Sequence, residues 1–340
     1  MSKSLNIREF ARLARVSPAT VSRAFAGGKL VSTSTRKALL ALAEKVGYRP
    51  NYPARAVFGG RSATVGVLLP DLRVSYFADI AAGLTQELLA QDTLPIVLDG
   101  RCGDERKGLQ RLVDQRVDGI LLTPVDKSIR RAEFRALLRQ DLPLVLVDTP
   151  RPLAPDSVRT DDLLSGRLAG EHLLALGHRR FAFCYFGEGA SACDLRLEGF
   201  RQALASADAA LKNRDVARLH PHDPARDERL RDQLRAILAR RDRPTAVFAS
   251  TDLLALEVYR AARELRLRIP DDLSVVGCAD LAFSAQIDPP LTTVRQDGLA
   301  VGRAAARAIL NRLDHPDAPP SQAVLPTALV VRGSTAQPRR

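Results

Sequence analysis

The sequence has 340 residues, of which 46% are apolar, and a formal net charge of +12. It has no charged-then-apolar leader and no run of 18 apolar residues, which argues against export and against a membrane-spanning helix. The four cysteines, Cys102, Cys184, Cys193 and Cys278, are not paired at metal-ligand spacing. We therefore expect them to be buried thiols in a reducing cytoplasm.

The positive charge is concentrated at the amino terminus. Residues 1–62 contain 12 lysines and arginines but only two acids, Glu9 and Glu44, whereas the remaining 278 residues contain 39 basic and 37 acidic side chains. A short basic segment before a nearly neutral body is typical of a nucleic-acid-binding domain joined to a second domain. A solvated basic tail is the weaker alternative, because the segment also has the apolar periodicity and helix caps of a folded domain.

This basic segment predicts three short helices. Asn6 opens the first in a pattern close to a capping box. Ser17-Pro18 gives the second helix a cap and a first-turn proline, and Gly27-Gly28 ends it. The third helix begins at 31–32 and stops at Gly47. Two short helices joined by a tight turn and braced by a third form a helix-turn-helix domain, in which the second helix enters the major groove.

From about Ala63, short apolar runs alternate with helical patterns. This rhythm predicts parallel sheets that are covered by helices on both faces. It restarts after Arg180, so we expect two lobes, one near 63–160 and one near 161–340. The predicted strands are 64–69, 94–98, 119–122 and 144–147 in the first lobe, and 181–184, 245–248 and 273–276 in the second.

The sequence contains no catalytic or metal-binding pattern. Its five histidines, including His220 and His222, show neither metal-ligand nor nucleophile spacing, and a metal site in that loop is the weaker alternative. The stretch 187–189 (GEG) lacks the third glycine and the acidic partner of a dinucleotide-binding fingerprint. We therefore expect no enzyme activity, no cofactor and no metal.

Several motifs resemble the LacI/GalR family of bacterial transcriptional regulators, and the resemblance covers essentially the whole chain. Residues 16–23 (VSPATVSR) and 47–51 (GYRPN) look like the DNA-binding head of that family. Four further stretches resemble sequence motifs of the body of that family: 176–180, 196–200, 269–277 and 289–294.

The resemblance implies an α/β protein with three parts. A small all-α helix-turn-helix domain would occupy 1–50, a hinge helix or linker 51–62, and the body 63–340. The body would have two lobes with parallel sheets, like a periplasmic binding protein, and would bind a ligand between the carboxyl ends of facing strands.

The resemblance also implies that the start of the second helix reads base edges. Pro18 and Ala19 occupy the two positions that usually discriminate sequences, and Arg23 lies one turn further along. Arginine pairs with guanine in a bidentate manner, whereas alanine offers only apolar contact. Short hydroxyls near helix starts suit phosphate oxygens, although Ser17 and Ser32 also fit simple caps. The implied DNA-binding residues are Asn6, Ser17, Pro18, Ala19, Thr20, Ser22, Arg23, Ser32, Thr35, Tyr48, Asn51, Arg55 and Val57.

The linker departs from the family at one position. A helix of under two turns is unstable alone, and in the family this segment becomes helical on operator DNA, pairs with its dimer mate and inserts a leucine into the minor groove. Val57 stands where leucine is usual, and valine is shorter and β-branched. Either the DNA kink is milder or Phe58 shares the wedge, and a plain flexible linker is the weaker alternative.

The implied effector site combines matches and departures. Arg196 matches the ligand-anchoring arginine of the family, for which a surface ion pair is the alternative. Thr251 and Ala279 stand where sugar-binding members often have asparagine and aspartate, which argues against a neutral hexose bound in the usual way. Asp148 and Asp252 also fit loop or helix-cap carboxylates. The implied effector-binding residues are Asp71, Ser75, Tyr76, Phe77, Thr123, Asp148, Arg196, Thr251, Asp252, Ala279 and Asp280.

We therefore expect a cytoplasmic, nucleoid-associated repressor that binds a near-palindromic, double-stranded operator as a homodimer. Its effector would be a small polar molecule, a sugar, sugar acid or sugar phosphate, and the loss of a carboxylate at Ala279 favours an anion anchored by Arg196. The end at Arg339-Arg340 has no leucine heptad, which favours a dimer over a tetramer. One alternative is a regulator whose body responds to a protein partner; an enzyme on an α/β scaffold is the more remote one.

Overall fold

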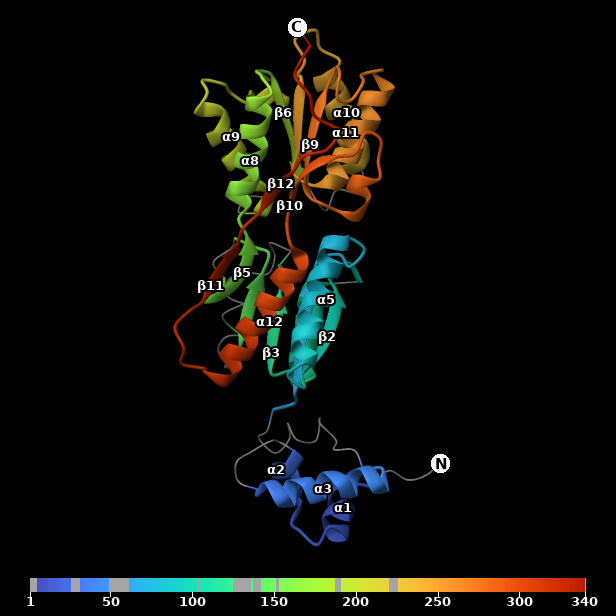
Figure 1. The fold of residues 1–340 in the computed structure, drawn as a ribbon, viewed down its shortest axis with the longest axis vertical. Coiled ribbons are helices and arrows are strands. Elements are labelled where there is room, and N and C mark those ends of the chain that lie inside the picture. Colours follow the sequence, from blue (N-terminus) through green and yellow to red (C-terminus); the bar gives the residue numbers. More distant parts are fainter. Residues whose placement is uncertain are drawn as a thin grey trace.

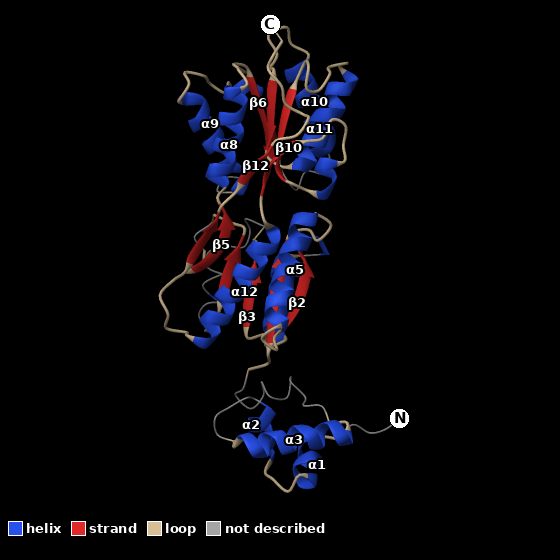
Figure 2. Ribbon diagram, viewed as in Figure 1, coloured by secondary structure: helices blue, strands red, loops and turns tan. Residues whose placement is uncertain are grey.

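A computed structural model describes residues 5–25, 31–48, 61–102, 104–124, 136, 142–150, 153–186, 191–219 and 226–339. Along the chain, a helical head is followed by two α/β lobes, each built around one sheet (Figures 1 and 2). The predicted fold class is confirmed. In the described part of the chain, no helix is both long and apolar enough to cross a membrane.

The head contains the three predicted helices, α1 (Ile7–Leu13), α2 (Pro18–Phe25) and α3 (Thr33–Val46). Asn6 forms a full capping box with Glu9, and Ser32 caps α3. Gly47 ends α3 with a φ of 66°, a left-handed conformation that glycine adopts at low cost. The core of the head includes an aromatic cluster in which Phe10 stacks on Tyr48, with ring centroids 4.1 Å apart.

The first lobe has a sheet of six parallel strands in the order β11-β5-β4-β3-β1-β2. Helices α5 and α12 cover one face, and α6 packs on the other. The strands are β1 (Thr64–Leu69), β2 (Leu94–Asp99), β3 (Gly119–Leu122), β4 (Leu144–Val147), β5 (Asp156–Thr160) and β11 (Gln322–Leu325), and the helices are α5 (Ser75–Leu89), η1 (Gly100–Cys102), α6 (Glu105–Asp114) and α12 (Gly298–Asp314).

The second lobe has the order β12-β10-β9-β8-β6-β7, and only β12 runs antiparallel to its neighbour. Helices α8 and α9 pack on one face, and α10 and α11 on the other (Figure 2). The strands are β6 (Phe181–Phe186), β7 (Val216–Leu219), β8 (Ala246–Ala249), β9 (Ser274–Ala279), β10 (Thr292–Arg295) and β12 (Ala328–Val330), and the helices are α8 (Asp162–Ala175), α9 (Ala192–Ala205), η2 (Asn213–Asp215), α10 (Arg226–Leu238), α11 (Asp252–Glu264) and η3 (Ala282–Ala285).

The predicted boundary between the lobes needs a correction. The chain crosses between them three times, from β5 to α8, from β10 to α12 and from β11 to β12. Residues 298–325 therefore belong to the first lobe, although the prediction assigned everything after 161 to the second. An amphipathic helix such as α12 looks the same whichever sheet it covers, so its pattern alone does not reveal the lobe.

Each lobe contains one helix pair packed at unusually close range. In the second lobe, a Cβ added at Gly166 on α8 would lie 2.0 Å from the carbonyl oxygen of Arg196 on α9, and one at Gly199 would lie 2.0 Å from that of Leu163. In the first lobe, Gly83 and Gly302 play the same part between α5 and α12. The approach of α8 to α9 brings the first residue of α8, Asp162, against Arg196.

We expect Gly166→Ala to lower the free energy of unfolding by about 1–3 kcal/mol, because the added methyl group would overlap backbone that cannot move aside. Gly108→Ala on α6 is the matched control, since its Cβ would meet side-chain tips rather than backbone, Leu68 at 3.0 Å and Leu98 at 3.7 Å. Urea denaturation of both variants measures the difference. Equal stability of the two would contradict the close-packing argument.

Candidate functional site

The start of α2 presents the predicted base-reading positions to solvent. Pro18, Ala19 and Arg23 are exposed, whereas Val21 and Ala24 face the core of the head. The Ser17 hydroxyl accepts a hydrogen bond from the Thr20 backbone N–H and lies 2.9 Å from the Thr20 hydroxyl. The helix therefore packs through one face and leaves the other available to a groove.

The remaining predicted DNA contacts have different surroundings. Ser22 is half-buried on α2, and Ser32 bonds Thr35 through both the backbone N–H and the hydroxyl of that residue. The ring of Tyr48 is 6% exposed, so its position in the structure is that of a packing residue; burial raises its pKa. Asn51, Arg55 and Val57, with Phe58, lie outside the described residues.

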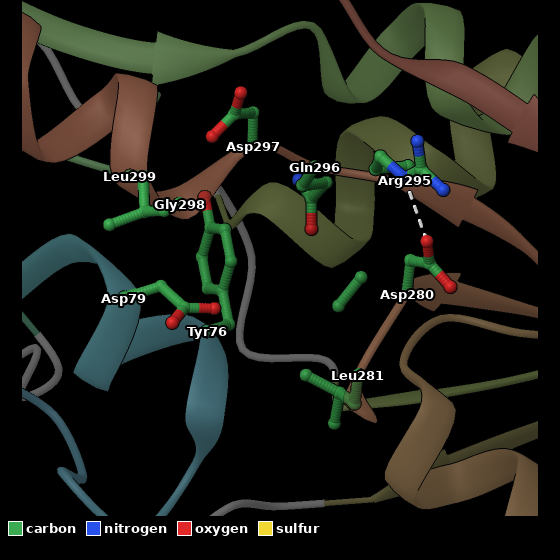
Figure 3. A pocket seen from close by; sticks show the side chains of 10 residues that line it. Tyr76, Asp79, Asp280, Leu281, Arg295, Gln296, Asp297, Gly298 and Leu299 are labelled. Carbon is green, nitrogen blue, oxygen red and sulfur yellow. Dashed lines mark hydrogen bonds and ion pairs between the residues drawn. The ribbon is translucent and has the colours of Figure 1, made fainter. Parts of the chain in front are cut away.

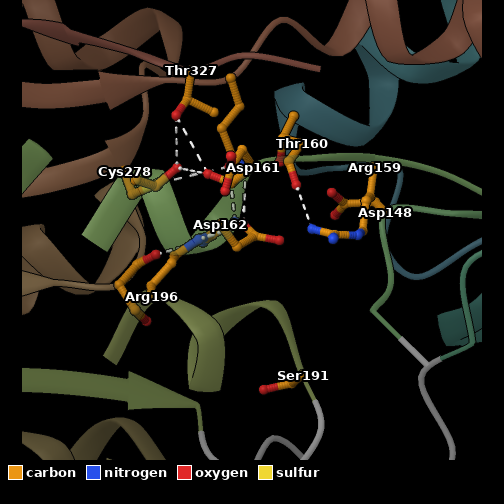
Figure 4. A network of polar contacts seen from close by, with 12 residues as sticks. Asp148, Arg159, Thr160, Asp161, Asp162, Ser191, Arg196, Cys278 and Thr327 are labelled. Carbon is orange, nitrogen blue, oxygen red and sulfur yellow. Dashed lines mark hydrogen bonds and ion pairs between the residues drawn. The ribbon is translucent and has the colours of Figure 1, made fainter. Parts of the chain in front are cut away.

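The centre of the second site is Arg196, which is 4% exposed. Its Nε donates to Asp162 Oδ1 at 3.0 Å, its Nη1 to the Ser250 carbonyl oxygen at 2.6 Å, and its Nη2 to Gln296 Oε1 at 3.0 Å (Figure 4). The alternative of a surface ion pair is therefore wrong, because this pair is buried. Each nitrogen of the guanidinium already has a protein partner.

Gln296 connects this arginine to two crossovers between the lobes. It follows β10 directly, and its Nε2 donates to the Thr160 hydroxyl at the end of β5 and to Asp162 Oδ1. Gln296, Thr160 and Asp162 are not among the effector-binding residues predicted from the sequence. The available signal was their position, since each is a polar residue at or just beyond the carboxyl end of a strand.

Asp148 supplies a second carboxylate from the first lobe. It lies just beyond β4 with a φ of 52°, and its Oδ1 accepts a hydrogen bond of 2.8 Å from the Tyr76 hydroxyl on α5. Part of its surface stays open, yet the surrounding protein desolvates the carboxylate and, together with the nearby Asp162, raises the pKa of Asp148 to about 7. Desolvation also raises the pKa of Asp162, which Arg196 opposes.

A cavity of about 270 Å³ adjoins this network (Figure 3). Tyr76 and Gln296 belong to both the network and the cavity wall, which Ala279, Asp280 and Gly298 extend. Ala279 has a φ of 121° and Asp280 a φ of 54°. Strained backbone of this kind collects at functional sites, where the surrounding structure holds it in place.

Unpartnered polar atoms collect at the same strand ends. Five buried side-chain atoms in the described part of the chain have no hydrogen-bond partner: Thr123 Oγ1, Asp162 Oδ2, Ser250 Oγ, Arg240 Nε and Glu257 Oε2. Thr123 and Ser250 directly follow β3 and β8, and Asp162 follows the end of β5. A buried polar atom without a partner is costly, so these positions require a ligand or water.

The structure corrects one predicted effector residue. Asp252 is fully buried within the second lobe, where it accepts hydrogen bonds from the Leu281 backbone N–H and from the hydroxyls of Ser284 and Thr293. These bonds hold the turn after β9 against α11. Asp252 is therefore a structural carboxylate, and a ligand would have to displace its partners.

Other predicted effector residues also have protein partners. Thr251 caps α11, and Asp71 pairs with Arg73 and Arg101, of which Arg73 is the main cause of its lowered pKa. Asp280 lines the cavity but pairs with Arg295 and Arg332. Ser75 begins α5, and the half-buried Phe77 ring lies 5.4 Å from that of Tyr76. Tyr76, Asp148 and Arg196 thus belong to the polar network, and Ala279 and Asp280 line the adjoining cavity. Thr123 follows β3 at a strand end.

Within the described ranges, no group of three histidine, cysteine or acidic side chains could hold a metal ion. Cys184 and Cys278 are buried free thiols, and burial raises the pKa of both; Cys193 is half-buried and also free. The side chain of Cys102, the histidines 220 and 222 and the stretch 187–189 lie outside what the structure describes.

A helix-turn-helix head and a two-lobed body with polar side chains at its strand ends define a DNA-binding regulator built on a periplasmic-binding-protein fold. Residues 6–51 match the family described as bacterial regulatory proteins, lacI family, and residues 171–335 match the periplasmic binding protein-like domain. The ribose operon repressor of Haemophilus influenzae is 30% identical over 332 residues, covering 96% of this chain and 98% of that protein. The chain belongs to the LacI family of transcriptional regulators, which are not enzymes.

Two solved structures show the same similarity. The lac repressor dimer bound to operator and the anti-inducer ONPF has a TM-score of 0.79 at 28% identity, covering 98% of this chain and 100% of that chain. The complex of the transcriptional regulator CelR with cellobiose has a TM-score of 0.71 at 29% identity, covering 97% and 99%.

We expect ionisation of Asp148 to lower the stability of the protein as the pH rises from 5 to 8, against an opposite contribution from His178 and His172, whose pKa values burial lowers. A carboxyl group whose pKa is raised on folding contributes stability that is fully present below its unfolded value and is lost as the pH rises through its folded value, about 7 for Asp148. In thermal melts across this range, the stability of Asp148→Asn relative to the wild type should therefore increase with pH, while Asp162 and the two histidines contribute equally to both proteins.

Asp272→Asn is the control for this experiment. Asp272 pairs with Arg268 at the surface, which lowers its pKa far below the tested range, so this variant should keep the slope of the wild type. An identical slope in the wild type and in Asp148→Asn would show that Asp148 does not titrate there.

Proposed function

We propose that this protein is a repressor that binds a near-palindromic operator as a homodimer, and that a small polar effector between its lobes controls its DNA affinity. The observation that carries the proposal is the joint presence of an exposed α2 face in the basic head and unpartnered polar atoms at strand ends of both lobes. A DNA-binding domain and a ligand-binding site on the same chain allow the ligand to control the affinity for DNA.

The charge distribution supports the DNA-binding part. Of the net charge of +12, the first 62 residues carry +10, and phosphate neutralisation by lysine and arginine provides much of the affinity for DNA. Arg23 is exposed on α2, and Pro18 and Ala19 are exposed at the start of the same helix; in a helix-turn-helix domain this helix enters the major groove, which supports the proposed base-reading role of the three residues.

The crossovers support the switch. Gln296 and Thr160 lie where the chain passes between the lobes, and both are bonded to the network around Arg196. A ligand that changes this network would change the relative orientation of the lobes, as in hinge closure. Reciprocal coupling between ligand and operator follows by linkage and is typically about 1–3 kcal/mol.

The related structures narrow the class of effector. The structures of relatives hold cellobiose, ribose and ONPF, so a molecule rich in hydroxyl groups is the starting proposal for this chain. The anionic effector predicted from the sequence loses its support. Each nitrogen of Arg196 already has a protein partner, and Asp162 and Asp148 both lie beside this cation.

The full chain should select a near-palindromic site from a random DNA library, with an affinity that falls on the order of 10³–10⁵ between about 50 and 200 mM salt. Arg23→Ala should cost roughly 1–3 kcal/mol on the selected operator and relax the base preference at one position of each half-site. Fluorescence anisotropy on operator and random DNA measures both effects.

Arg12→Ala provides the matched control, because Arg12 is an exposed arginine of the head on α1 rather than on α2. It should weaken binding to operator and to random DNA by similar factors. Unchanged base preference in Arg23→Ala, or binding that ignores salt, would refute the assigned role of the head.

A further inference from the structure

Positive charge around the effector site is largely committed to protein partners. Arg196 is bonded through each of its nitrogens, and Arg295 and Arg332 both pair with Asp280. Half-buried Arg159 donates to the Thr160 carbonyl oxygen at 3.2 Å and lowers the pKa of Asp162. An anionic ligand would therefore find, among the described cations, only part of Arg159.

The carboxylates of the site are less well compensated. Asp162 is 0% exposed, and its Oδ2 has no hydrogen-bond partner. Asp148 has one side-chain hydrogen bond, from the uncharged Tyr76 hydroxyl, and the carboxylate of Asp162 disfavours its ionisation, an effect that Arg196 opposes. Figure 4 shows both side chains; Asp148 follows β4 of the first lobe, and Asp162 is the first residue of α8 in the second lobe.

The adjoining cavity repeats this imbalance at its wall. Asp79 and Asp297 both line it, and the pKa of Asp79 is raised by burial and by the neighbouring Asp297, with no described cation opposing the rise (Figure 3). Asp297 accepts a bond from the Ala300 backbone N–H as the cap of α12. The cavity thus continues the acidic character of the network beyond Tyr76 and Gln296.

Building on the proposed function, we infer that the effector carries a protonated amine that lies between Asp148 and Asp162 and donates to the free Asp162 Oδ2. A hydroxyl group could also donate to this oxygen, but it would leave the two carboxylates repelling each other. An ammonium group satisfies the acceptor and removes the repulsion together, in charge-assisted hydrogen bonds. The polar remainder of the molecule would occupy the cavity, so the effector class is an amino sugar or a similar amino polyol.

The test compares probes that share one sugar or polyol scaffold and differ in one substituent, which is neutral, cationic or anionic. Glucose, galactose and mannose are matched with their 2-amino, 2-acetamido and 6-phosphate derivatives, and glycerol is matched with 3-amino-1,2-propanediol as a minimal pair. Binding to the full chain is measured by thermal shift and calorimetry at pH 7.5. At least one amine should bind tenfold or more tightly than its neutral parent and than its acetylated or phosphorylated counterpart.

Variants place the amine. Asp162→Asn should reduce the affinity for that amine at least tenfold and bring it to the level of the neutral parent, and Asp148→Asn should weaken the amine more than the neutral parent. Asp271→Asn is the control, because Asp271 lies at the surface beside Arg268 and Arg339 and should not affect binding. Ligand-free melts check that each variant folds.

A second readout does not depend on variants. Ammonium binding should stabilise the ionised form of Asp148, so calorimetry at pH 6.5, where the free amine is already protonated, in buffers of different ionisation heat should reveal proton release for the amine and none for its neutral parent. If the Asp162→Asn variant does not fold, this measurement on the wild type still tests the inference.

The outcomes separate this inference from the proposed function. The inference is overturned if a neutral or anionic probe binds most tightly. It is also overturned if the amines bind no more tightly than their neutral parents or do not bind at all. If such a neutral ligand still changes operator affinity, the proposed function stands. Failure of the full chain to prefer any operator would instead end the proposed function while leaving the amine measurement unaffected.

Discussion

A guanidinium enclosed by protein requires a carboxylate beside it, because an uncompensated buried charge is expensive. Asp162 provides that carboxylate for Arg196, at 2.9 Å, and the pair sits where α8, α9, the end of β8 and two crossovers meet. The contact exists because Gly166 and Gly199 let the two helices approach until backbone touches backbone. The close packing of α8 against α9 thus fixes the position of Asp162 relative to Arg196.

The same constraint explains the electrostatics of the site. With one oxygen of Asp162 held by Arg196 and Gln296, its other oxygen remains without a partner, and Asp148 from the other lobe adds a second carboxylate nearby. The two lobes therefore meet across two carboxylates that share a single buried cation, Arg196. A ligand that balances these charges also gains influence over the orientation of the lobes.

Much of this architecture could be predicted from the sequence, because the signals are local. Caps and stops such as Asn6, Ser32 and Gly47 mark the helices of the head, and the four strands predicted in the first lobe are all present as apolar runs. The strands β5, β7, β10, β11 and β12 were missed, since polar residues interrupt or shorten their apolar runs. The assignment of 298–325 to the wrong lobe has a different cause, because that pairing joins distant parts of the chain.

The network around Arg196 was predictable only where a family motif or a carboxylate at a strand end indicated the residue. Arg196 and the strand-end Asp148 were found, whereas Asp162 follows another aspartate in a run that fits an ordinary helix start, and Gln296 has no pattern of its own. Asp252 shows the opposite case, a strand-end carboxylate that the fold uses for hydrogen bonds inside the lobe. Nothing in the spacing of these aspartates distinguishes the two outcomes, which depend on contacts between residues more than 25 positions apart.

The return of the chain to the first lobe also bears on how the protein is made. The apolar face of the first sheet is completed by Val301, Ala305 and Ile309 of α12, and its edge by β11. On the ribosome, the strands β1 to β5 emerge long before these residues, so they must wait with an uncovered apolar face while the entire second lobe is synthesised. The hydrophobic core described for the head is formed by residues between Leu5 and Tyr48, so the head has no such delay. Growth of the nascent chain therefore favours an order of folding in which the DNA-binding head folds first and the second lobe next. The first lobe, to which the head is joined, folds last.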